Sequence, residues 1–275
     1  MENNSEFLKP TLIKLERARK QLLEIYDFNK NLWKENKIQI TPKLCVDKKG
    51  YEFYTNNYTE DNLLEEISLR IGEYIHNLRS TLDNLIFGFA RIKTNPPTKP
   101  IKLSFPIFEN ENYFVKDTKE IFNQIPEILK NEIIKYQPYN VRKNNPKSEN
   151  SLYSLSIVQT LNNIDKHRVP IILVANLNEI KFDGSFEFDN EDFTNIIDEK
   201  NGFCNFYKVL PNSKIFEFRT LEKIEKMNMN FDVSVDIAID YPNQNLNIDI
   251  LKNLYNDIAL LINDLILVVK KTEEK

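Results

Sequence analysis

The chain contains 275 residues, which is enough for one large or two small domains with a substantial buried core. Its net charge of −4 and pI near 5.5 argue against a general nucleic-acid coat protein, because such proteins are usually basic. With five glycines and no GxxxxGK, GxGxxG or GxSxG pattern, the chain lacks the turns that P-loop, dinucleotide and hydrolase-elbow sites require.

Cysteine usage and hydropathy indicate the compartment. Cys45 and Cys204 form no CxxC pair, so we expect neither a zinc site nor a disulfide scaffold and favour a reduced cytosolic setting. The first residues are charged and polar, without an apolar signal core. The longest apolar run, residues 258–269, is interrupted by Asn263 and Asp264 and is too short to cross a bilayer. The sequence therefore predicts a cytoplasmic protein with no membrane partner.

The first half of the chain alternates helix signals with one hairpin signal. Residues 6–37 repeat apolar side chains at three- and four-residue spacing, which predicts a long amphipathic helix. Alternating segments around Asp47-Lys48-Lys49-Gly50 predict a hairpin near 38–56. A second long helix, capped by Thr59 and ending near residue 93, is apolar around most of its circumference and should be buried. Residues 105–108 (FPIF) should lie on the core as an extended strip, followed by short helices at 116–123 and 126–136.

The second half predicts a loop, a helix, a sheet and a closing helix. The segment after Gln137 contains Arg142, Lys143 and Lys147, and reads as a solvated surface loop or a phosphate-contacting flap. Residues 152–168 should form another core helix. Period-two alternation at about 169–241, with a turn at Asp183-Gly184, predicts an antiparallel sheet, and residues 246–271 predict the last helix.

This order of elements predicts an α+β fold with a helical core. We expect residues 1–168 to form the helical core with its small hairpin and residues 169–242 to form a sheet layer. Residues 243–275 should form a C-terminal helix that packs back on the helical core, all within one compact unit.

One of the two histidines lies on a polar arc of the second long helix. With His76 set to zero, Glu73 lies at about +60°, Ser80 at about +40°, Asp83 at about −20° and Arg79 at about −60° around the helix axis. A base, a guanidinium, a hydroxyl and two carboxylates therefore share one side of an otherwise apolar helix.

Two segments resemble known signatures. Residues 73–83 (EYIHNLRSTLD) and 161–168 (LNNIDKHR) resemble the paired HNLRSxLD and DKHR signatures of a group of uncharacterised bacterial proteins. The resemblance extends to residues 16–19 and to the FPIF strip, although the group often has a histidine where this chain has Lys20-Gln21-Leu22. Arg70 and His76 also fit the Arg-x(4–6)-His pattern of HEPN-like helical toxin and defence ribonucleases. That similarity implies an RNA- or nucleotide-directed effector of a bacterial toxin or anti-phage defence system.

The corresponding chemistry would be metal-independent phosphodiester cleavage. A neutral histidine can take a 2′-hydroxyl proton at neutral pH, and a guanidinium can stabilise charge on phosphorane oxygens. On this hypothesis His76 and His167 are base and acid, Arg79 and Arg168 hold the phosphate, and Asp83 orients an imidazole. The residues expected to contact substrate are Glu73, Asn77, Ser80, Asn162, Asp165 and Lys166. RNA or a nucleotide is the expected partner, no cofactor is expected, and a homodimer is left open.

Two other interpretations use the same residues. The first is a non-catalytic protein that binds a ligand or partner and whose His/Arg/Asp cluster is a structural network, with pairs such as Asp83–Arg168 or Asp165–Arg79 between helices. The second is a metal site made by the two histidines and a carboxylate. Glu73 and His76 have the i, i+3 spacing of bundle carboxylate sites, but a di-metal bundle needs two such pairs, so we expect no metal. The sequence leaves enzyme and binding protein as alternatives.

Overall fold

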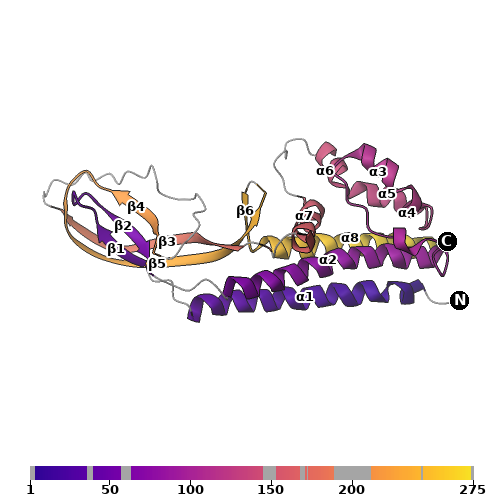
Figure 1. Ribbon diagram of the computed structural model, residues 1–275, viewed down its shortest axis with the longest axis horizontal. Coiled ribbons are helices and arrows are strands. Elements are labelled where there is room, and N and C mark those ends of the chain that lie inside the picture. Colours follow the sequence, from indigo (N-terminus) through magenta and orange to yellow (C-terminus); the bar gives the residue numbers. More distant parts are fainter. Residues whose placement is uncertain are drawn as a thin grey trace. The chain divides into compact units, whose positions relative to one another are not determined.

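The computed structural model describes residues 4–35, 40–56, 63–144, 153–167, 171, 173–188, 212–242 and 244–273. Within these ranges it leaves out the side chains of 4–5, 32–35, 40, 63–64, 167, 173–188, 215–216, 227–236 and 272–273. The chain divides into two compact units (Figure 1). The helical unit comprises Met1–Tyr26, Leu69–Ile171 and Asp249–Lys275, and the strand unit comprises Asp27–Ser68 and Ile172–Ile248. Helices form one unit and antiparallel strands gather in the other, which confirms the expected α+β class with a helical core.

Four long helices confirm the helices expected from the apolar spacing. They are α1 (Asn4–Glu35), α2 (Leu63–Lys93), α7 (Ser154–His167) and α8 (Ile250–Glu273). Both α1 and α2 continue from the helical unit into the strand unit. In the helical unit, α5 (Ile128–Lys135) and α7 both pack on α8. The remaining short elements are η1 (Pro100–Lys102), α3 (Glu111–Asp117), α4 (Lys119–Phe122) and α6 (Pro138–Asn144).

Helix α2 is the core element of the helical unit. Its fully buried apolar side chains include Ile71, Ile75, Leu78, Leu82, Leu85, Ile86, Phe89 and Ala90. Tyr74 is also fully buried, and its hydroxyl donates a 2.7 Å hydrogen bond to the Leu251 carbonyl of α8. Gly88 allows α1 to approach, because a Cβ at this position would lie 2.7 Å from the Phe7 carbonyl oxygen. The near-continuous apolar surface is therefore covered by neighbouring helices, as expected.

The segment after Gln137 differs from the expected loop. Pro138 begins α6, and the Asn140 and Val141 amides both donate to the Gln137 carbonyl at 2.9 and 3.0 Å. The fixed φ of proline suits the first turn of a helix, where a missing N–H costs nothing. Arg142 and Lys143 therefore lie on a helix, whereas Lys147 is outside the described residues.

The strand unit contains two antiparallel sheets. The first has the order β1-β2-β4, formed by β1 (Ile40–Leu44), β2 (Gly50–Thr55) and β4 (Lys214–Arg219). The second has the order β3-β5-β6, formed by β3 (Leu173–Phe188), β5 (Ile224–Tyr241) and β6 (Gln244–Asn247). The hairpin β1–β2 confirms the expectation near 38–56, and Gly50 adopts a φ of +145° at its turn. Because β2 pairs with β4, the hairpin belongs to the strand unit, not to the helical segment with which the sequence pattern grouped it.

Two local expectations in the sheet region are wrong. The strand β3 continues through Asp183-Gly184, which pair with Asn230 and Met229 of β5 instead of forming a turn. A partner strand as long as β5 supplies hydrogen bonds on both sides of the glycine, which outweighs its local turn preference. Residues 244–247 form β6 against the end of β5, so the last helix begins at Ile250 and not near 246. Residues 189–211, which belong to the region expected to form the sheet, lie outside the described residues.

Candidate functional site

One flank of the polar arc on α2 is taken up by α1. The Lys14 ammonium donates to the Ser80 hydroxyl. The Asn77 amide donates to Gln21 Oε1 at 2.8 Å, and the Gln21 amide lies 3.5 Å from a Glu73 carboxylate oxygen. Three of the expected substrate-contacting residues therefore contribute to a polar seam between two antiparallel helices.

Arg79 and Asp83 form an ion pair on α2 that holds the backbone of Phe105. Arg79 donates to Asp83 Oδ1 at 2.7 Å and to the Phe105 carbonyl oxygen at 2.9 Å. The Phe105 amide in turn donates to Asp83 Oδ1 at 2.8 Å. The two side chains therefore satisfy both backbone groups of Phe105, as a neighbouring β-strand would.

Burial makes this arrangement energetically significant. Arg79 is only 9% exposed. Burial lowers the pKa of its guanidinium, and the adjacent Asp83 carboxylate opposes that shift. A buried guanidinium needs a partner for its charge and for its donors, and the i, i+4 spacing places Asp83 within reach on the same helix. The carboxylate partner of Arg79 among the described residues is thus Asp83, not Asp165.

The sequence interpretation missed a second side chain that holds the same strip. Gln137 is fully buried, and its amide donates to the Pro106 carbonyl at 2.9 Å. Its side-chain oxygen accepts from the Phe108 amide at 3.1 Å. An extended strip that contains proline and lies on a helical core needs side-chain partners for its backbone, and this requirement is the signal that could have pointed to Gln137.

The α7 residues of the expected site have different environments. Asp165 lies against α2, where a Cβ added to Gly72 would be 2.5 Å from its Oδ1. Asn162 is 4% exposed, and its side-chain oxygen has no hydrogen-bond partner among the described atoms. Lys166 is exposed. The structure thus brings Asp165 of α7 next to α2 one turn before His76.

Of the two histidine side chains of the expected site, the structure describes that of His76. His76 is exposed on α2, as is Glu73. His167 is the last residue of α7, but its side chain and all of Arg168 lie outside the described part of the chain. The convergence of the two imidazoles on one substrate therefore stays a prediction.

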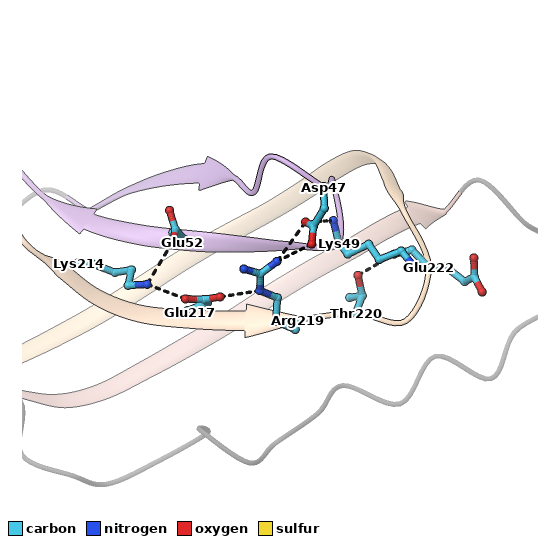
Figure 2. Close-up of polar contacts among 8 residues, drawn as sticks. All are labelled: Asp47, Lys49, Glu52, Lys214, Glu217, Arg219, Thr220 and Glu222. Carbon is cyan, nitrogen blue, oxygen red and sulfur yellow. Dashed lines mark hydrogen bonds and ion pairs between the residues drawn. The ribbon is translucent and has the colours of Figure 1, made fainter.

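A second polar cluster covers one face of the β1-β2-β4 sheet (Figure 2). Glu52 and Glu217 lie directly opposite each other, and the Lys214 ammonium bridges them at 3.2 and 2.7 Å. Arg219 donates to Glu217 at 2.5 Å and to Asp47 at 2.9 Å. The hydrogen bonds from Lys214 and Arg219 hold the pKa of Glu217 below its ordinary value. Alternating charges thus neutralise a carboxylate pair that would otherwise repel across the strands.

No protein-family model matches the chain, and no solved structure matches it. Within the described residues, no helix is long and apolar enough to pass through a membrane. In the same part of the chain, no group of three or more histidine, cysteine, aspartate and glutamate side chains is placed to hold a metal ion.

Proposed function

We propose that this chain is a non-catalytic ligand- or partner-binding protein whose Arg79 and Asp83 form a structural network. The hydrogen bonds of this pair to both backbone groups of Phe105 are the observation that supports the proposal. A phosphate clamp needs a guanidinium whose donors face a substrate, and one terminal nitrogen of Arg79 bonds Asp83 while the other bonds the backbone. Releasing Arg79 to a substrate would leave the Phe105 carbonyl without its bond.

The proposal is tested by measuring stability and activity on the same proteins. Wild type and Arg79→Ala are compared by urea unfolding and by incubation with mixed RNA. We expect the variant to lose stability and neither protein to cleave RNA. Cleavage by the wild type that Arg79→Ala abolishes, with the free energy of unfolding unchanged, would overturn the proposal.

The second candidate is an RNA- or nucleotide-directed effector of a bacterial toxin or defence system, acting in the cytoplasm. The exposure of His76 and of Glu73 one turn away favours it, because a general base must be reachable by its substrate. In this candidate His76 takes the 2′-hydroxyl proton and His167, whose side chain lies outside the described part of the chain, is the acid.

The exposed position of His76 makes its test selective. His76→Ala removes an exposed side chain, so we expect the variant to fold like the wild type. Glu65→Ala, which changes another exposed residue of α2, is the matched control. Cleavage by wild type and Glu65→Ala but not by His76→Ala supports the candidate, and equal cleavage or none by all three proteins rejects it.

A further inference from the structure

A lysine-lined hollow lies in the strand unit and shares Asp47 with the polar cluster of the β1-β2-β4 sheet. Its volume is about 740 Å³, and it is lined by Val46, Asp47, Lys48, Lys49, Lys223, Ile224, Glu225 and Lys226. These residues come from the β1–β2 turn and from the connection into β5. Two backbone hydrogen bonds join the segments, from the Ile224 amide to the Lys48 carbonyl at 2.8 Å and from the Thr220 amide to the Lys49 carbonyl at 3.1 Å. The hollow is therefore built on two connected turns.

The hollow carries excess positive charge in a chain that is acidic overall. Asp47 is ion-paired with Arg219 at 2.9 Å and also accepts the Lys49 amide at 3.0 Å, so its charge is already compensated. Within the described residues, no carboxylate lies within 4.0 Å of the ammonium groups of Lys48, Lys49 and Lys223. The cations of the neighbouring sheet face, in contrast, are paired (Figure 2).

The backbone at Lys48 adds an independent observation. Lys48 adopts a φ of +59°, in the left-handed region that glycine and asparagine occupy more readily. A residue with a Cβ in this conformation is strained, and such strain concentrates at functional positions. Lys48 is exposed at the turn, where its amide donates to the Cys45 carbonyl at 2.9 Å and its carbonyl accepts the Ile224 amide at 2.8 Å.

We infer that this hollow binds ligands that carry two or more linked phosphate groups. Lysine ammonium groups bind phosphate as point charges, and several around one space suit a clustered polyanion. The volume falls within the range of roughly 300–1,000 Å³ that small-molecule sites occupy. Among the described residues, no aromatic side chain lines the hollow to stack against a base, so recognition would rest on the phosphates. This inference does not depend on the role of Arg79.

Binding is tested with inorganic triphosphate and with vesicles. Triphosphate is titrated into the full chain by calorimetry, and sedimentation is measured with phosphatidylcholine vesicles with and without phosphatidylinositol bisphosphate. The variant Lys48→Glu/Lys223→Glu removes the proposed site, and Lys116→Glu/Lys252→Glu makes the same charge change on exposed lysines of the helical unit. We expect the first variant to bind about tenfold more weakly or worse and the second to bind like the wild type.

The arms of the experiment separate the sources of phosphate. Binding of triphosphate but not of vesicles by the wild type, lost in Lys48→Glu/Lys223→Glu, indicates a free oligophosphate ligand. Binding that requires phosphatidylinositol bisphosphate in the vesicles, is lost in the same variant and is competed by triphosphate indicates a lipid headgroup. Lys48→Gly/Lys223→Gln keeps the turn geometry and should also weaken binding. This variant tests the site even if Lys48→Glu/Lys223→Glu fails to fold. Glu225→Gln should strengthen binding, because it removes a carboxylate from the lining. No binding to either probe, or equal losses in Lys48→Glu/Lys223→Glu and in Lys116→Glu/Lys252→Glu, overturns the inference.

Discussion

Arg79→Ala tests whether the ion pair on α2 stabilises the helical unit. The change removes a charged hydrogen bond to the Phe105 carbonyl at 2.9 Å and another to Asp83 at 2.7 Å. A hydrogen bond to a charged group contributes about 1.5–3 kcal/mol, and a buried backbone carbonyl left without a partner costs about 1–3 kcal/mol. The Asp83 side chain is 36% exposed, so water can hydrate its carboxylate once Arg79 is removed, and the lost ion pair adds little to the loss of stability. We therefore expect the free energy of unfolding to fall by about 2–4 kcal/mol.

The assay is urea unfolding followed by far-ultraviolet circular dichroism, with Arg17→Ala as the matched control. Arg17 is 54% exposed and lies 3.8 Å from Glu24, so its loss should cost about 0.5 kcal/mol or less. Asp83→Ala should in addition speed hydrogen exchange at the Phe105 amide, which donates to Asp83. Equal stability of Arg79→Ala and Arg17→Ala, with unchanged exchange at Phe105, would refute the structural role of the pair.

Three further changes test close packing and the sheet charges. Gly88→Ala should lower the free energy of unfolding by about 1–3 kcal/mol, because its Cβ meets the Phe7 backbone carbonyl at 2.7 Å; thermal unfolding measures this loss. The Cβ of Gly72→Ala meets only the end of the Asp165 side chain, so the gain in helix propensity of about 1 kcal/mol should offset the contact and leave the free energy of unfolding nearly unchanged. A loss of stability as large as that of Gly88→Ala would contradict this expectation. The pKa of Glu217 is lowered in the folded protein, so its stabilisation is present above its ordinary value of 4.5 and is lost as the pH falls through the folded value. Glu217→Gln should accordingly flatten the acid side of a stability–pH profile, and an unchanged profile would exclude this contribution.

The sequence by itself determined the long helices, the hairpin and the α+β class. Apolar side chains at three- and four-residue spacing predicted α1, α2 and α8 because such a pattern leaves a helix one stable way to bury its surface. The turn at Gly50 was predictable for a local reason, since only a few residue types accept its φ of +145°. These features depend on neighbours in the chain.

Tertiary structure decided what the polar residues do. The helical arc of Arg79 and Asp83 followed from spacing, but their shared bonds to Phe105 required knowledge of which segment lies on α2. The same holds for β3, which continues through Gly184 because it pairs with β5. It also holds for the hollow beside Lys48, which two turns distant in sequence form together. Periodicity shows which side of an element is apolar, but long-range hydrogen bonds and charge pairs depend on a partner that the local pattern does not contain.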